Sequence, residues 1–125
     1  MSDLKGKSDL KGKRVLLVED EPIVAMMIEE MLAELGAETV GPAASLQQAM
    51  QMAEADAFDV AILDFNLNGE RTGEVGKRLH SRGIPFIFMT GYGSVGDQGF
   101  GEAATLQKPC QFEEIVKALE TALGD

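Results

Sequence analysis

The stretch Val60-Ala61-Ile62-Leu63-Asp64 is a short apolar run that ends in a single carboxylate. The turn-forming segment Phe65-Asn66-Leu67-Asn68-Gly69 follows it directly. An apolar run of this length, bounded by turn residues, is typical of a buried strand in a parallel sheet. Because open α/β sheets bind their ligands beyond the carboxyl ends of the strands, we expect Asp64 to lie at a functional edge.

Short apolar runs alternate with helical patterns along the rest of the chain. We predict further strands at 14–18, around 38–40, at 86–89 and, weakly, at 104–107. We predict helices after Pro22, after Ser45, from about 72 to 81 and from Phe112 onward. Gly41-Pro42 is expected to end the second strand, and Ser45 with Gln48 forms a capping box for the second helix. This alternation predicts an α/β fold, a doubly wound five-stranded parallel sheet between two layers of helices.

The segment between the fourth and fifth predicted strands is rich in glycine, from Gly91 to Gly101. The fold needs a crossover helix there, yet each interior glycine costs up to about 1 kcal/mol against alanine. We therefore expect this helix to be short, displaced or disordered.

Length, composition and charge limit the possible classes of protein. The chain has 125 residues, enough for one domain, and the hexapeptide at 2–7 recurs at 8–13. We expect residues 1–12 to be a flexible N-terminal tail and 13–125 to be the domain. The formal net charge of −10 argues against direct nucleic-acid binding, and no apolar run is long enough for membrane insertion. The single Cys110 excludes an internal disulfide, which favours a cytoplasmic protein.

The ends of the predicted strands carry the polar groups of a reactive site. Glu19 and Asp20 follow the first strand, Asp64 ends the third, Thr90 follows the fourth and Lys108 the fifth. Clustered carboxylates need a cation, and Mg²⁺ with its preference for oxygen ligands suits them. An ionised Asp64 beside that cation is a plausible nucleophile for a phosphoryl group, with the lysine ammonium and the threonine hydroxyl binding the phosphoryl oxygens.

Four segments carry a resemblance to a known family. Leu17-Val18-Glu19-Asp20-Glu21-Pro22, Ile62-Leu63-Asp64, Met89-Thr90-Gly91 and Gln107-Lys108-Pro109 stand in the order found in the receiver domain of bacterial two-component response regulators. Each motif alone is weak, but the four together, each at the end of a predicted strand, are specific. From about Arg14 to its end, the chain resembles single-domain receivers that carry a Phe-x-Thr-Gly-Tyr segment.

The resemblance implies a flavodoxin-like receiver fold with strand order 2-1-3-4-5 and three α/β/α layers. It implies that Asp64 accepts a phosphoryl group from a histidine kinase or phosphotransfer protein in a Mg²⁺-dependent reaction. Asp20 would bind the metal directly, Glu19 through water, and Asn66 through its backbone carbonyl. Such a chain is not an enzyme beyond slow hydrolysis of its own aspartyl phosphate. Since the chain ends right after the last helix, we expect it to signal by binding a downstream protein partner.

Three positions depart from the family pattern. Thr105 stands where an aromatic switch residue is usual, and Cys110 stands where phenylalanine is common. Tyr92, two residues after Thr90, is a candidate substitute switch. Taken alone, Asp64 would be read as a helix-capping acid and Thr90 as a turn residue, so the assignment depends on the whole set.

Other functions compete with the phospho-receiver. The chain would be an interaction module that signals without phosphorylation if it failed to bind Mg²⁺. It would be a fragment if it came from a hybrid kinase or a larger regulator. A phosphatase or phosphotransferase using an aspartyl phosphate is less favoured, because Asn66 stands where such hydrolases place a second aspartate.

Overall fold

The computed structural model describes residues 10–55, 57–67, 69–90, 104–108 and 111–124. Five parallel strands form one sheet in the order β2-β1-β3-β6-β7. Their bounds are β1 Arg14–Val18, β2 Glu38–Ala43, β3 Val60–Asp64, β6 Phe86–Thr90 and β7 Ala104–Gln107. Counted among these five strands alone, the order is the predicted 2-1-3-4-5, so the doubly wound fold is confirmed.

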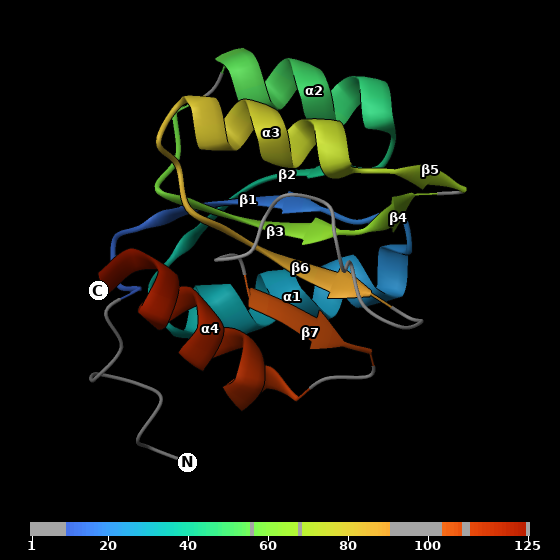
Figure 1. Cartoon of the computed structure of the whole chain (residues 1–125). Coiled ribbons are helices and arrows are strands. Elements are labelled where there is room, and N and C mark those ends of the chain that lie inside the picture. The colour runs from blue at the N-terminus through green and yellow to red at the C-terminus, as the bar shows by residue number, and fades with distance from the viewer. Residues whose placement is uncertain (1–9, 56, 68, 91–103, 109–110, 125) are drawn as a thin grey trace.

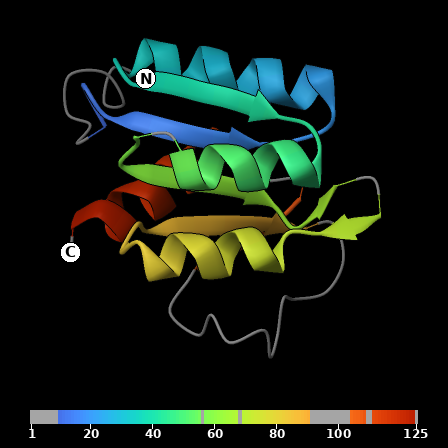
Figure 2. The same ribbon diagram turned by 90° about the horizontal axis from the view of Figure 1, so that it is seen from above.

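Helices cover both faces of the sheet in three layers (Figure 1). The helices α1 (Pro22–Glu34) and α4 (Phe112–Gly124) pack on one face, and α2 (Leu46–Ala55) and α3 (Gly73–Ser81) pack on the other. Figure 2 shows the strands side by side, with their carboxyl ends at one edge of the sheet. This edge is where the predicted site residues follow their strands.

The alternation of side chains along each strand explains the two cores. In β3, Ala61 and Leu63 face the α2/α3 side, while Val60 and Ile62 face the α1/α4 side, and all four are fully buried. A strand covered on both faces needs an almost continuous apolar sequence. For this reason the first four residues of β3 are all apolar, and Asp64 at its end is the first polar one. The two packed layers hold the strand ends in fixed relative positions.

The second strand is longer than predicted. β2 runs through Gly41-Pro42 to Ala43, so the expectation that this dipeptide ends the strand is wrong. β2 is an edge strand, where a proline need not donate to a ladder, and its register with β1 is irregular between Leu16 and Val18. The extension brings the Ala43 carbonyl to within 2.9 Å of the Glu19 amide nitrogen, which donates a hydrogen bond to it.

Leu10, the first described residue, already packs against the domain. Leu10 is fully buried in the core beneath α1 and α4, and the Gly12 amide donates to the Gly36 carbonyl at 2.8 Å. Residues 10–12, part of the predicted tail, therefore contact the domain through one apolar side chain of the polar repeat and one backbone hydrogen bond. Residues 1–9 lie outside the described part of the chain.

Two local features complete the frame of the site. The predicted capping box of α2 forms in part, with the Gln48 amide donating to Ser45 Oγ at 3.1 Å. The Gln48 side chain accepts from the Ala44 amide at 3.0 Å. After β3 the chain forms an antiparallel hairpin, β4 (Asn66–Leu67) and β5 (Glu70–Arg71), where the sequence indicated only a loop. The predicted short or disordered crossover helix at 91–101 lies outside the described residues.

Candidate functional site at the carboxyl edge of the sheet

Four strand ends deliver the predicted polar side chains to one place. Glu19 and Asp20 follow β1, Asp64 ends β3, Thr90 ends β6 and Lys108 follows β7. The strands are parallel and adjacent in the order β1-β3-β6-β7, so these residues share one edge. The Lys108 amide donates to the Thr90 carbonyl at 2.8 Å, which fixes the end of β7 against the end of β6.

The lysine ammonium bridges two carboxylates. Lys108 Nζ lies 3.1 Å from Asp64 Oδ2 and 3.5 Å from Glu19 Oε1. Glu19 is 1% exposed and Asp64 is 4% exposed, whereas the Lys108 side chain keeps 25% of its surface. A buried carboxylate needs a paired charge, so the lysine compensates part of the negative charge at this edge.

The acidic residues form a cluster that can hold a cation. Carboxylate oxygens of Glu19, Asp20 and Asp64 all lie within 4.8 Å of one another. The Glu21 amide donates to Glu19 Oε2 at 3.1 Å, and the Asn66 amide donates to Asp64 Oδ1 at 3.3 Å. One ammonium cannot neutralise three carboxylates, so the donor set fits a hard divalent cation that prefers oxygen ligands.

The electrostatics of the cluster reflect burial and crowding. Burial raises the pKa of Glu19 from 4.5 to about 7, and the nearby Asp64 carboxylate acts in the same direction. Burial also raises the pKa of Asp64, against the opposing attraction of Lys108. Burial lowers the pKa of Lys108, but the attraction of Asp64 and Glu19 outweighs it, so the net direction is upward. A nearby positive charge therefore stabilises the ionised form of Glu19 and of Asp64.

The remaining predicted residues differ in where they lie. Thr90 is 6% exposed at the end of β6, on the same edge as Asp64. Asn66 begins β4, and its side-chain oxygen accepts from the Gly69 amide at 2.7 Å. Thr105 is exposed on β7, paired in register with Phe88. Tyr92 and Cys110 lie outside the described residues, so the predicted part of Tyr92 in the switch stays a prediction.

Sequence reasoning missed one residue that touches the site. Thr72 is fully buried, and its hydroxyl donates to the backbone carbonyl of Asp64 at 2.9 Å. The signal was weak, because the residue stands eight positions after Asp64 and reads as an ordinary start of α3. The intervening hairpin brings it back to the end of β3.

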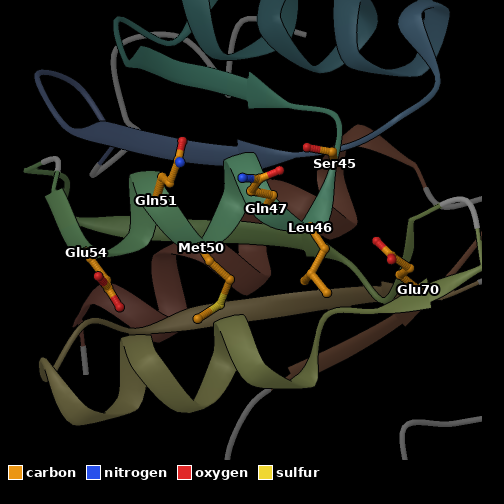
Figure 3. Close-up of a pocket in the computed structure, with 7 residues that line it drawn as sticks. All are labelled: Ser45, Leu46, Gln47, Met50, Gln51, Glu54 and Glu70. Atoms are coloured by element: carbon orange, nitrogen blue, oxygen red, sulfur yellow. The ribbon is translucent and has the colours of Figure 1, made fainter.

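A surface pocket of about 580 Å³ lies elsewhere, between α2 and β5 (Figure 3). Leu46 and Met50 contribute its apolar part, and Glu54 and Glu70 contribute carboxylates. None of the residues that line it belongs to the acidic cluster. The cluster, and not this pocket, is therefore the candidate site.

No helix in the described ranges combines the length and apolar character needed to cross a membrane.

Comparisons with known proteins agree with this geometry. Residues 15–120 match the model of the response regulator receiver domain family. The transcriptional regulatory protein PdtaR of Mycobacterium tuberculosis H37Rv is 31% identical over 118 residues, which cover 90% of this chain and 57% of PdtaR. The chain thus spans little more than half the length of that relative.

Solved structures give the same result. The solution structure of SdrG from Sphingomonas melonis Fr1 is 38% identical, with a TM-score of 0.74, covering 90% of this chain and 96% of that one. The receiver domain of PhyR from Erythrobacter litoralis is 25% identical, with a TM-score of 0.79, covering 90% and 91% of the two chains. The family match over most of the sequence, together with the sheet order and the carboxyl-edge site, shows that the chain belongs to the response regulator receiver domain family.

Proposed function

We propose that this chain is a phospho-receiver of a two-component system, with Asp64 as the residue that accepts the phosphoryl group. The observation that supports this most is the meeting of Asp64, Glu19 and Lys108 from three separate strand ends, with Lys108 Nζ 3.1 Å from Asp64 Oδ2. A carboxylate with a purely structural role needs one partner, whereas the Asp64 carboxylate lies beside the Lys108 ammonium and two further carboxylates.

The proposed donor is the phosphohistidine of a histidine kinase or phosphotransfer protein. A carboxylate oxygen of Asp64 attacks phosphorus, the new P–O bond forms as the P–N bond breaks, and the electron pair returns to the imidazole nitrogen. Lys108 compensates charge on the phosphoryl oxygens, and the Thr90 hydroxyl donates to one of them. No other substrate is turned over, so the chain is a signalling module with, at most, slow hydrolysis of its own aspartyl phosphate.

The proposed cofactor is Mg²⁺. Asp20 and Asp64 would bind it directly, Glu19 through water, and Asn66 through its backbone carbonyl. Support comes from the three carboxylates within 4.8 Å and from the pKa of Glu19, which burial and the nearby Asp64 carboxylate raise and which a bound cation would lower. When bound, the ion supplies positive charge next to the equatorial phosphoryl oxygens.

Partner binding has a suitable surface beside the acids. Ile23, Met26 and Met27 are 68%, 52% and 47% exposed at the start of α1, directly after Glu19–Glu21. Positions i, i+3 and i+4 share one helix face, so these side chains form a single apolar patch. A protein that delivers a phosphoryl group to Asp64 has to cover the rim of the site, and this patch, which we call the α1 patch, is part of that rim.

The output would pass through a downstream protein partner and not through nucleic acid, in keeping with the net charge of −10. The setting we propose is the cytoplasm. The switch would involve Tyr92 or Thr105 in place of the usual aromatic residue.

The test is intact-mass analysis after incubation with a small phosphodonor such as acetyl phosphate, with and without Mg²⁺. We expect the gain of one phosphoryl group that requires Mg²⁺ and is lost in Asp64→Asn. A native chain that binds Mg²⁺ but gains no phosphoryl group from either a small donor or a phosphohistidine protein would favour a phosphorylation-independent module.

A further inference from the structure

The N-cap of α3 departs from the usual chemistry of helix starts. Thr72 occupies the N-cap position, where a hydroxyl normally accepts a hydrogen bond from an amide of the first turn. Its side chain makes no such bond. Ser45 before α2 provides a direct contrast, because its hydroxyl accepts from the Gln48 amide at 3.1 Å.

The Thr72 hydroxyl instead donates backward along the chain. Thr72 Oγ1 lies 2.9 Å from the backbone oxygen of Asp64, and both residues are buried. The Thr72 amide also donates to the Phe65 carbonyl at 3.0 Å. Thr72 therefore holds the carbonyls of two successive residues, the last residue of β3 and the one that follows it. A hydroxyl that lacks the usual capping bond and binds another group instead indicates a functional role for that other bond.

The bonds from Thr72 close the chain segment between Asp64 and α3 into a fixed arch. Inside this arch lies the hairpin, in which Asn66 pairs with Arg71. At the base of the arch the Asn66 amide donates to Asp64 Oδ1 at 3.3 Å. That amide belongs to the peptide between Phe65 and Asn66, whose carbonyl accepts from the Thr72 amide, and the preceding peptide carries the carbonyl that accepts from the Thr72 hydroxyl. The hydroxyl of Thr72 thus acts on the carboxylate through the backbone.

We propose that Thr72 is a positioning residue of the acceptor site: its hydroxyl holds the Asp64 carbonyl and so orients the Asp64 carboxylate and the Asn66 backbone for the cation and the phosphoryl group. The inference rests on the proposed function and adds a residue that determines the geometry of that same site. Thr72 itself touches neither the cation nor the phosphoryl group.

Variants at this position separate the hydroxyl from the shape of the side chain. Thr72→Ser keeps the hydroxyl and Thr72→Ala removes it, so these two differ by one oxygen atom. Thr72→Val keeps the branched shape without the donor. All three retain the amide that donates to Phe65. Ser45→Ala is the matched control, since it removes a hydroxyl from the N-cap of another helix.

The experiment measures Mg²⁺ affinity by calorimetry well below each melting temperature, together with hydrogen exchange of the Asn66 amide and the phosphorylation rate with acetyl phosphate. We expect Thr72→Ala and Thr72→Val to bind Mg²⁺ roughly tenfold more weakly than the native chain, in the range seen when an outer partner of a metal ligand is removed. Their Asn66 amide should exchange faster and their phosphorylation should slow. Thr72→Ser should restore Mg²⁺ affinity to within about twofold of the native value.

The outcomes separate this inference from the proposed function. Equal Mg²⁺ affinity, Asn66 exchange and phosphorylation rate in Thr72→Ala and Thr72→Ser, with only a lower melting temperature in the first, would show a merely structural role and overturn the inference. A native chain that takes no phosphoryl group would contradict the proposed function instead, and the Mg²⁺ affinities would still decide the part of Thr72. Loss of Mg²⁺ affinity in Ser45→Ala as large as in Thr72→Ala would also count against a specific role.

Discussion

Lys108 Nζ and Asp64 Oδ2 lie 3.1 Å apart, although the two residues stand 44 positions apart in the sequence. The ammonium comes from the end of β7 and the carboxylate from the end of β3, and β6 lies between these strands in the sheet. The ion pair therefore reports the correct assembly of three strand ends. In our account the same ammonium then compensates the negative charge of the phosphoryl group on Asp64.

Removal of this ammonium tests its part in the chemistry. We expect Lys108→Ala to slow phosphorylation by a small phosphodonor on the order of 10²-fold, as when a preorganised stabilising group is deleted. The reason is that charge on the phosphoryl oxygens would lose a partner held close to Asp64. Lys77→Ala is the control, because Lys77 is exposed on α3 and pairs with Glu74 of the same helix at 3.6 Å. Equal rates in the two variants would show that Lys108 has no catalytic part.

Mg²⁺ binding should depend on pH through Glu19. The pKa of Glu19 is raised from 4.5 to about 7. At pH 6 this carboxyl group is therefore protonated in most molecules, and a binding cation has to displace that proton. We expect Mg²⁺ affinity to rise about tenfold between pH 6 and pH 8, in step with the ionised fraction, with protons released on binding. Calorimetry in two buffers of different ionisation enthalpy measures both. Glu19→Gln should flatten this dependence, and an unchanged pH profile in that variant would contradict the assignment.

The same shift predicts how the metal-free chain responds to pH. A carboxyl group with a raised pKa in the folded state favours folding while it is protonated in both states, below its ordinary pKa of 4.5. That contribution is lost as the pH rises from 4.5 to about 7, where the buried group must ionise. We therefore expect Mg²⁺ to raise the melting temperature more at pH 8 than at pH 6, which differential scanning fluorimetry can follow. A larger effect at pH 6 would contradict the prediction.

The α1 patch should matter for a protein donor and not for a small one. Met26→Asp places a charge within this patch, so we expect it to slow phosphotransfer from a phosphohistidine protein by about tenfold, the effect of losing roughly 1.4 kcal/mol of docking energy. Phosphorylation by acetyl phosphate should stay within about twofold, because that donor needs no docking surface. Gln51→Asp on α2 adds the same charge on the opposite face of the sheet. Equal phosphotransfer rates in Met26→Asp and Gln51→Asp would exclude the patch as the docking surface.

The N-terminal anchor can be tested by stability alone. Leu10 is fully buried against the core under α1 and α4, so Leu10→Ala removes apolar contacts and leaves a cavity. We expect the free energy of unfolding to fall by about 2 to 5 kcal/mol in urea denaturation. Ile23→Ala, at a position 68% exposed, should change it by no more than about 0.5 kcal/mol. A change at Leu10 as small as at Ile23 would mean that the N-terminal turn does not stabilise the domain.

Much of the site was predictable because parallel strands are read easily from sequence. Buried strands need unbroken apolar runs, and the residues that follow such runs must meet at one edge of the sheet. Asp64 at the end of VAILD is predictable for this reason, whereas the strand ATLQ before Lys108 is only weakly indicated by its sequence. The contact between Lys108 and Asp64 follows from the sheet order, which the family resemblance supplied.

Other features leave little trace in the sequence. The strands of the β4–β5 hairpin have two residues each, too few for any periodicity. Leu10 stands within a polar repeat, and its burial depends on a space between distant elements. Thr72 reads as a helix cap, and only the arch between β3 and α3 shows that its hydroxyl binds Asp64. Gly41-Pro42 reads as a strand breaker, and only the edge position of β2 makes it tolerable.

The most direct test of the central claim is to locate the phosphoryl group. Reduction with sodium borohydride converts an aspartyl phosphate to homoserine, which peptide mass spectrometry assigns to a position. After phosphorylation with Mg²⁺ present, our account predicts homoserine at position 64 and none when Mg²⁺ is removed with a chelator. Homoserine at position 20, or the same yield at position 64 without Mg²⁺, would contradict it.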